Sequence, residues 1–388
     1  MVKSELSEYL LFRTTIKLWL MAVGLWPEDQ HYLWLRFLTL FHLFLNSISI
    51  LAIVGFMVKY KHNIKLLMIG TSIFIGFTGT FFRTAVILVN HKSLKKLHQI
   101  LDLRFKKILT NSELSEIILN RLKPIRFLSS MLITATYAIS FLFSTKPILI
   151  MIYMHFFHIY PVRHGFVLPG VYPWKTAVNG LFYKFHLTLE MIAMILSFCA
   201  TIGVDLLFSL YITQIIGQLI EMSHRISQLN EKKINYQIIK ETILQHEVLI
   251  ECFHDINNIF GPIILWGKIF NAGSICSAMY QINKLPKITP QHLTIPTVFI
   301  TYKLFQTFIC AFAGSQLTEE SENYINAVYS TNWQGDKDFM SFIVIMLGKK
   351  PFVLTACAFS NISIDMFKDV VSTALSYFFL LQTLDEKN

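Results

Sequence analysis

The sequence contains few charged residues for its length. Asp, Glu, Lys and Arg make up only 15% of the 388 residues, whereas 54% are hydrophobic and the mean hydropathy is positive. This composition excludes an ordinary water-soluble protein and predicts a membrane protein. The 34 Phe residues suit contact with lipid and with apolar ligands.

The sequence also lacks the motifs of a metal site or an enzyme. No CxxC pair occurs among the five cysteines, so we expect free thiols and no metal ion. There is no glycine-rich phosphate loop or nucleophile–base pair, and His246-Glu247 does not start a zinc-protease motif because Ile250 occupies the place of the second His. The charge of +10 is spread between apolar runs and forms no single basic face. We therefore expect no catalytic activity, no cofactor and no nucleic-acid partner.

Several apolar runs are long enough to cross a bilayer, which takes about 20 residues of helix. They are residues 37–58, 66–89, 127–145, 187–213, 259–283, 292–315 and 362–384. The sequence thus predicts an all-α, polytopic membrane protein with seven transmembrane helices. The run 339–348 is too short to cross and predicts a half-buried or cytosolic helix.

The basic residues of the loops predict the orientation. Roughly twice as many Lys and Arg lie in segments that share a side with the N-terminus, which favours a cytosolic N-terminus and an extracellular C-terminus. Apolar residues recur at helical spacing from 219 to 256, so spans four and five are expected to continue as long helices that pack within the chain or on a neighbouring subunit. The expected organisation is a cytosolic segment 1–36, four spans in 37–213 with an outer loop 146–186, a cytosolic helical extension 214–258, two spans in 259–315, a cytosolic segment with a short helix 316–361, and the last span with a short outer tail 362–388.

A few charged residues interrupt the spans. Glu190 and Asp205 both lie in the fourth span, where a carboxylate at the centre of a bilayer would cost about 2.5 to 3.5 kcal/mol. Glu190 lies near the start of the span and Asp205 in its second half, and for both we expect exposure at the interface or a structural hydrogen bond. Single basic residues, Arg83, Lys268 and Lys303, lie in three other spans.

Short patterns in a fixed order along the chain carry a family resemblance. Gly24-Leu25-Trp26-Pro27 precedes the first span, Val171-Tyr172-Pro173-Trp174 lies in the second outer loop, and Asp205-Leu206-Leu207-Phe208 lies late in the fourth span. The strongest patterns are C-terminal: Ala327, Tyr329, Trp333, Lys350-Pro351, Leu354-Thr355-Ala356, Phe359, Ser363, Phe367 and Ser376-Tyr377-Phe378. Together they resemble the insect odorant receptor family. The sequence departs from the family at Cys357 and Ala358, where relatives often have Gly and Lys, so the turn before the last span is expected to differ.

The resemblance implies an odorant-gated, non-selective cation channel in the cell membrane of olfactory neuron dendrites. In that family an odorant-specific subunit assembles with a universal odorant co-receptor into a heterotetramer. Two alternatives stay open. A G-protein-coupled chemoreceptor would need an outside N-terminus and the Asp-Arg-Tyr and Asn-Pro-x-x-Tyr motifs, neither of which is present, and a secondary transporter would need inverted repeats.

A candidate ligand pocket lies in the outer halves of spans two, three, four and six. Aromatic, Met and hydroxyl side chains occur together there, which suits volatile, mostly apolar ligands because burial supplies affinity and a few hydroxyl groups set orientation. The candidate residues are Ser72, Phe74, Phe77, Tyr137, Ser140, Phe141, Ser144, Met191, Met194, Phe299 and Tyr302.

The last span carries a polar stripe. On a helix, Asp365, Asp369, Ser372, Ser376, Leu380 and Thr383 fall within an arc of about 80°, with Phe367, Val371, Phe378 and Leu381 opposite. Such a stripe either joins helices or faces water. Repeated around an axis, the leucines at its outer end would form a hydrophobic constriction. By resemblance, the family's gate lies at the positions of Leu380 and Leu384, and the candidate pore residues are Asp369, Ser372, Ser376, Leu380, Thr383 and Leu384.

Overall fold

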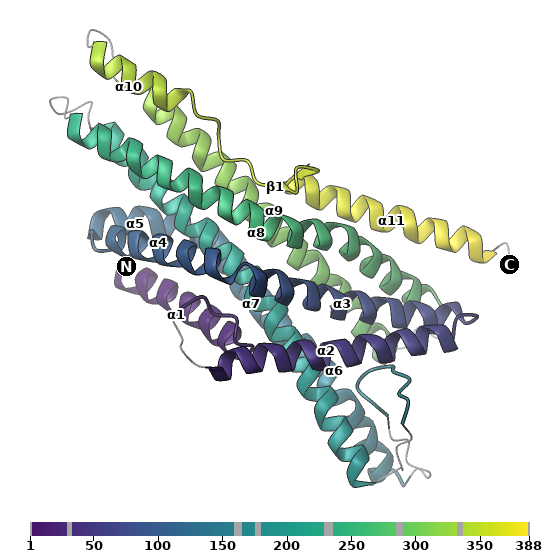
Figure 1. Cartoon of the computed structure of the whole chain (residues 1–388). Coiled ribbons are helices and arrows are strands. Elements are labelled where there is room, and N and C mark those ends of the chain that lie inside the picture. The colour runs from purple at the N-terminus through teal and green to yellow at the C-terminus, as the bar shows by residue number, and fades with distance from the viewer. Residues whose placement is uncertain are drawn as a thin grey trace.

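The chain is a bundle of long helices (Figure 1). The computed structural model describes residues 2–28, 33–158, 165–174, 180–228, 236–284, 290–331 and 337–386. The helices are α1 (Val2–Met21), α2 (Leu33–Lys59), α3 (Ile64–Val89), α4 (His91–Leu109), α5 (Ser112–Arg121), α6 (Lys123–Phe156), α7 (Leu181–Ser227), α8 (Tyr236–Asn283), α9 (Pro290–Tyr329), α10 (Lys337–Leu347) and α11 (Ile364–Glu386). Two short strands, β1 (Thr355–Ala356) and β2 (Ser360–Asn361), pair in antiparallel fashion before α11.

In the described residues, six helices are long and apolar enough to cross a membrane: α2, α3, α6, α7, α8 and α9. The seventh expected span corresponds to α11, whose polar stripe lowers its mean hydropathy. Helix boundaries differ from the predicted spans mainly because the helices continue past the apolar runs. α7 reaches 47 residues and α8 reaches 48, and α6 continues through Pro147 to Phe156, which shortens the expected outer loop. A helix satisfies its own backbone hydrogen bonds, so it need not stop where the hydrophobic pattern stops.

Helix α7 is the centre of the bundle. Every residue from Cys199 to Leu219 is buried. The helices that pack against α7 are α1 to α6, α8 and α9. A helix that is covered on all sides can be apolar all round, which explains the long uninterrupted hydrophobic run. Helix α4 packs closely on α7 at Gly217, where a Cβ atom would lie 2.3 Å from the Phe105 ring of α4.

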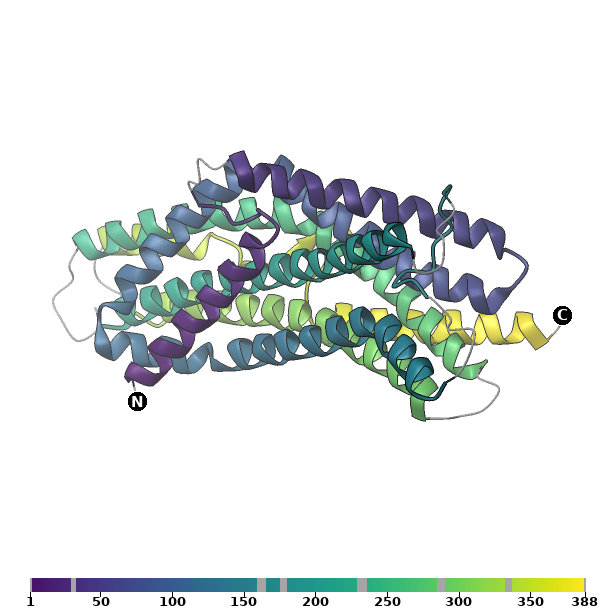
Figure 2. The same cartoon turned by 90° about the horizontal axis from the view of Figure 1, so that it is seen from below.

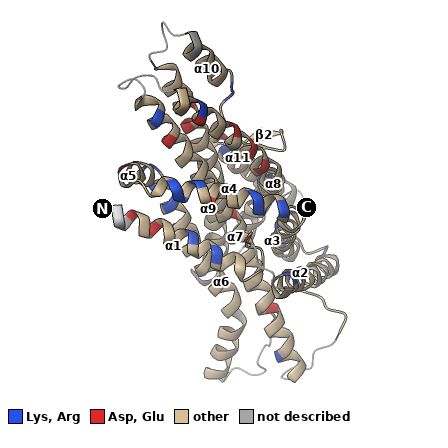
Figure 3. Cartoon of the chain, turned by 60° about the vertical axis from the view of Figure 1, so that its left-hand side comes forward, with Lys and Arg blue, Asp and Glu red and all other residues tan. Residues whose placement is uncertain are grey.

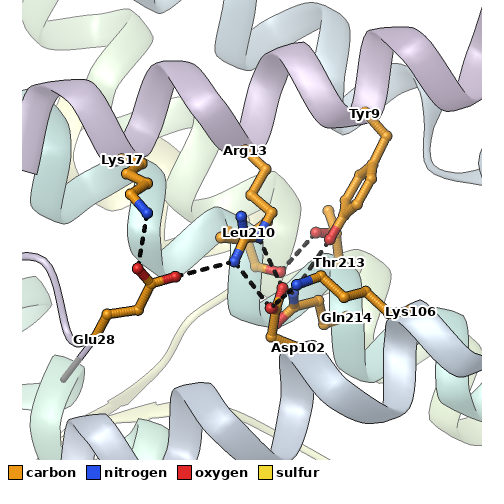
Figure 4. A network of polar contacts seen from close by, with 9 residues as sticks. All are labelled: Tyr9, Arg13, Lys17, Glu28, Asp102, Lys106, Leu210, Thr213 and Gln214. Atoms are coloured by element: carbon orange, nitrogen blue, oxygen red, sulfur yellow. Dashed lines mark hydrogen bonds and ion pairs between the residues drawn. The ribbon is translucent and has the colours of Figure 1, made fainter.

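One end of the bundle, which we call the packed end, consists of α1, α4, α5 and the buried part of α7. A polar network joins α1, α4 and α7 (Figure 4). Arg13 donates two hydrogen bonds to Asp102, at 2.8 and 2.9 Å, and Gln214 of α7 donates to the Tyr9 hydroxyl at 3.2 Å. Burial alone would raise the pKa of Asp102, but the hydrogen bonds from Arg13 and Lys106 outweigh it and hold that pKa below its ordinary value.

The two termini lie at opposite ends of the bundle (Figures 1 and 2). The N-terminus lies beside α5 at the packed end, and α11 runs to the C-terminus at the other end. Figure 3 shows most charged residues on the helices of the packed end and around α8 and α11, whereas the lower ends of α6 and α7 are almost free of them. Such a distribution is expected when the charged segments lie outside the lipid and the apolar segments lie within it.

A short hairpin connects α10 to α11. The amide of Phe359 donates to the carbonyl of Ala356 at 3.0 Å, and Cys357 and Ala358 both have positive φ angles, 52° and 60°. These values define a type I′ turn, which normally favours Gly. Gly314 of α9 allows the segment to approach closely, since a Cβ atom there would lie 2.2 Å from the carbonyl oxygen of Ile362.

Candidate functional site

A cavity of about 800 Å³ lies at the end of the bundle opposite the packed end. Its walls come from α3, α7, α8 and α9, with smaller contributions from α2 and α6 and from the loop 165–174. We call this part of the molecule the cavity end. The volume is within the range of small-molecule sites, about 300 to 1,000 Å³.

Glu190 of α7 fixes the loop that forms part of the cavity wall. Its carboxylate accepts hydrogen bonds from the amides of Val167 and Leu168, at 2.8 and 3.3 Å, and from the Tyr172 hydroxyl at 2.5 Å. The amide of Val171 donates to the carbonyl of Ala52 on α2 at 2.9 Å. The loop is therefore attached to two helices, and the costly carboxylate in the span serves as a structural hydrogen-bond acceptor.

Most of the cavity wall is apolar. Burying an apolar ligand against such a wall contributes roughly 25 cal/mol per Å² of surface removed from water. The apolar lining residues include Phe56, Ile69, Ile73, Phe77, Phe143, Phe166, Leu168, Met194, Phe198, Trp266, Phe270 and Phe299.

The deep part of the cavity is polar. Arg83 of α3 donates from Nε to Asp205 of α7 at 3.3 Å, and Gln306 of α9 donates to the same carboxylate at 2.5 Å. Lys303 donates to the Gln306 side-chain oxygen at 3.1 Å. Because Arg83 and Lys303 also line the cavity, we call this group of four residues the polar floor.

Five of the eleven sequence-predicted ligand residues line the cavity: Ser72, Phe77, Met194, Phe299 and Tyr302. The other six are not among its lining residues. They are Phe74, Tyr137, Ser140, Phe141, Ser144 and Met191. Phe74 packs against the apolar cluster that contains Phe77. Tyr137 is 57% exposed and its ring lies 4.8 Å from that of Trp19 on α1, so it belongs to the outer surface of α6. Helix α6 contributes Phe143 to the cavity instead.

Position along a span indicates depth in the membrane but not which face of α6 points inward. Helix α8 also contributes to the cavity, through Trp266, Gly267, Phe270 and Asn271, none of which the sequence pattern singles out. The isolated charges Arg83 and Lys303 were a signal that could have found the polar floor, because an ionisable residue inside a span needs a partner or a cavity.

Helix α11 leaves most of its polar stripe exposed. Asp365, Asp369, Ser372, Ser376 and Thr383 are exposed, and Leu380 and Leu384 are 55% and 52% exposed. The buried face holds Val370 and Ala374, which pack with Ala272 and Ile275 of α8, while Val371 is half-buried. Of the stripe residues, Asp369 forms an ion pair with Lys268 of α8, whereas Ser372, Ser376, Leu380 and Thr383 stay exposed.

These features define a class: a polytopic helical membrane protein with a cavity at one end and a last helix whose polar face is largely exposed. The family model described as 7tm Odorant receptor matches residues 63–375. The chain belongs to this seven-transmembrane odorant receptor family.

Relatives and solved structures agree with the family. Putative odorant receptor 85d of Drosophila melanogaster is 24% identical over 219 residues, 55% of this chain and 52% of the relative. The odorant receptor coreceptor of Anopheles gambiae is 26% identical over 38% of this chain and 31% of its own length. The chain thus spans about half the length, or less, of the curated relatives it matches. The olfactory receptor OR5 of Machilis hrabei in complex with eugenol has the same fold, with a TM-score of 0.79, 15% identity and coverage of 97% of this chain and 100% of that one.

Proposed function

We propose that this chain is the odorant-specific subunit of a ligand-gated, non-selective cation channel. A volatile ligand occupies the cavity, and α11 lines the pore. The observation that carries the proposal is the position of α8 between the two: one face of this helix lines the cavity and the adjacent face holds α11.

Contacts of neighbouring residues on α8 describe the coupling. Trp266 and Asn271 line the cavity, whereas Lys268 forms an ion pair with Asp369 of α11 at 3.1 Å. Ala272 packs in the cluster that contains Val370. A ligand that shifts α8 therefore shifts α11 with it, because packed helices move as units between discrete arrangements.

The exposed face of α11 has the composition of a pore wall. Ser372, Ser376 and Thr383 offer hydroxyl groups, and Asp369 attracts cations at one mouth. Leu380 and Leu384 form an apolar ring when the helix is repeated around an axis, and a ring of this kind closes a pore by dewetting.

One subunit cannot enclose a pore with a single helix, so the proposal requires partners. The similarity to coreceptors of mosquitoes supports assembly with a universal odorant co-receptor in a heterotetramer. The similarity of fold to an insect olfactory receptor along almost the whole chain disfavours the G-protein-coupled and transporter alternatives.

The first experiment tests the channel. The full chain is expressed with and without a co-receptor, and whole-cell current is recorded against a volatile panel. We expect a ligand-dependent cation current that needs the co-receptor. Surface-expressed chain that gives no current with any volatile and any co-receptor would contradict the proposal.

The second experiment tests the pore helix. In a Cys357→Ser background, which removes the exposed native thiol, Leu380→Cys and Leu384→Cys channels are treated with a charged thiol reagent. We expect the reagent to change the current at both positions and to leave Ala374→Cys, on the buried face, unaffected. Leu380→Ser or Leu384→Ser is expected to raise the basal current, whereas Val371→Ser mainly lowers expression. Reagent that modifies Ala374→Cys but neither leucine position would place a different face of α11 toward the ions.

The third experiment tests the orientation. The basic residues favour a cytosolic N-terminus and an extracellular C-terminus. An epitope fused before Met1 is expected to bind antibody only after permeabilisation, and one fused after Asn388 to bind it in intact cells. The opposite pattern would reverse the topology.

A further inference from the structure

The charges that line the cavity all have one sign. Among the described lining residues the charged ones are Lys59, Lys65, Arg83 and Lys303, and no Asp or Glu is present. Lys59 and Lys65 are exposed, at the turn between α2 and α3, whereas Arg83 and Lys303 are buried in the polar floor. Basic residues therefore lie both at the edge of the cavity and at its depth.

The polar floor holds two cations and one carboxylate. Asp205 pairs with Arg83 at 3.3 Å, and Lys303 reaches Asp205 only through the Gln306 amide. Lys303 is 7% exposed, and its ammonium group lies 5.6 Å from the ring centre of Tyr302. One hydrogen bond, to Gln306, is far fewer than the three that an ammonium group can donate. A buried cation with an incomplete set of partners is costly, and an anion in the cavity would complete the set.

Further donors lie beside the floor. The Trp266 indole nitrogen is buried and has no hydrogen-bond partner in the described structure. The indole nitrogen and one Arg83 guanidinium nitrogen both lie beside Gly79. A Cβ atom built on Gly79 would be 3.3 Å from each of them. Ser197, also buried in the wall, likewise has an unpartnered hydroxyl. Donors from α3, α8 and α9 thus lie at the polar floor, and Ser197 of α7 adds a further donor elsewhere in the cavity wall.

We propose that the cavity selects ligands with a carboxylate head and an apolar body, such as medium-chain carboxylic acids. The inference rests on the proposed function, since it names the ligand class of the same site. The head accepts hydrogen bonds from Lys303, Arg83 and Trp266, and the chain lies against the aromatic wall. Charge-assisted hydrogen bonds are stronger than neutral ones, so the floor discriminates between an acid and its ester. Lys59 and Lys65 raise the local concentration of anions at the edge of the cavity.

The test compares octanoate with methyl octanoate and 1-octanol on the full chain expressed with a co-receptor. We expect octanoate to act at a concentration at least tenfold lower than the ester. Lys303→Met is expected to raise the half-maximal octanoate concentration roughly 10- to 100-fold and to leave the ester within threefold. Lys303→Arg is expected to keep the preference for octanoate over the ester, because it keeps the positive charge. Lys184→Met, which removes an exposed lysine away from the cavity, serves as the matched control and leaves both ligands unchanged.

Equal potency of acid and ester in the wild type would overturn the inference, as would an equal shift of both ligands in Lys303→Met. If Lys303→Met does not reach the surface, Trp266→Phe replaces it. That variant keeps a ring against Phe82 and Phe270, whose centres lie 4.9 and 4.1 Å away, and removes only the indole donor. We expect a three- to tenfold loss for octanoate alone, and an equal or absent change for the two ligands overturns the inference.

A binding measurement separates the ligand class from the channel function. The purified full chain is melted with and without octanoate, and the melting temperature is compared with that of Lys303→Met. Stabilisation by octanoate that Lys303→Met abolishes, without any current in cells, would support the ligand class and contradict the channel. Current with esters, together with no stabilisation by octanoate, would support the channel and contradict the ligand class.

Discussion

The two ends of α7 are built differently. From Cys199 to Leu219 every residue is buried, whereas between Leu181 and Phe198 buried and exposed residues alternate. The first stretch is thus covered on all sides by neighbouring helices, whereas the second is only partly covered and contributes Met194, Ser197 and Phe198 to the cavity wall. A single helix therefore combines a fixed anchor with a wall that has room to move.

The polar groups of the packed end and of the polar floor also differ. At the packed end, Asp102 has two basic partners, Arg13 and Lys106, and Lys17 pairs with Glu28. At the cavity end, the two cations of the polar floor share Asp205. Charges at the packed end hold helices together, whereas those of the polar floor leave hydrogen-bonding capacity for a ligand.

The largest expected effect contrasts a glycine in tight packing with one in open space. A Cβ atom at Gly314 would lie 2.2 Å from the Ile362 carbonyl oxygen, whereas at Gly76, in the cavity wall, no atom lies within 4 Å. Gly314→Ala is expected to lower stability by about 3 kcal/mol, because backbone must move to relieve the overlap. Gly76→Ala is expected to be neutral or to stabilise by up to about 1 kcal/mol through helix propensity. Thermal melting in detergent checks both, and equal melting temperatures would remove the proposed difference in packing.

The next effect concerns pH at the packed end. His98 of α4 is buried against Trp26, with ring centres 4.8 Å apart, and burial lowers its pKa to about 4. Between pH 6.5 and 4 the unfolded chain binds a proton at this residue and the folded chain does not, so stability is lost as the pH falls through that window. We expect a loss of about 2 kcal/mol between pH 7.5 and 5 from this residue alone.

The matched variants are His98→Leu and His62→Leu. His98→Leu keeps an apolar side chain against Trp26 and is expected to flatten the pH dependence in this window. His62, exposed at the turn between α2 and α3, is expected to change nothing when replaced by Leu. A pH dependence that stays the same in His98→Leu would show that this histidine is protonated in the folded protein.

The sequence predicted the helices better than the site. Hydropathy is a local property, so the apolar runs located α2, α3, α6, α7, α8 and α9, and the polar stripe located the exposed face of α11. The membership of the cavity depends on the rotation of each helix about its axis, which is set by neighbours far away in sequence. Trp19 of α1 packs on Tyr137 and fixes the outward face of α6, a contact that no spacing on α6 reveals.

Tyr137 and Tyr302, both candidate ligand residues from the sequence, lie in different surroundings. Tyr302 is 3% exposed and lines the cavity, whereas Tyr137 is 57% exposed on the surface of α6. Tyr302→Ala is expected to shift the ligand concentration for half-maximal current about tenfold, because it removes a large ring from the wall. Tyr137→Ala is expected to leave that concentration within about twofold at equal surface expression. A shift in Tyr137→Ala alone would move the ligand site to the outer face of α6.

The smallest expected effect concerns the hairpin, which joins α10 at one end of the molecule to α11 at the other. Ala358 has a φ angle of 60°, a left-handed conformation that costs an L-residue roughly 1 to 2 kcal/mol relative to Gly. Its side chain is exposed, so Ala358→Gly removes this strain without opening a hole in the core. The greater freedom of Gly in the unfolded chain offsets part of the gain, and we expect a net stabilisation of about 0.5 to 1 kcal/mol, measured as a rise in melting temperature.

Ala356→Gly in β1 is the matched control. Ala356 is buried in an extended conformation, so this change lowers stability. If Ala358→Gly instead lowers the melting temperature while changing the ligand response, the strained turn takes part in the movement of α11. The hairpin would then couple α10 to the pore helix, in addition to the coupling through α8.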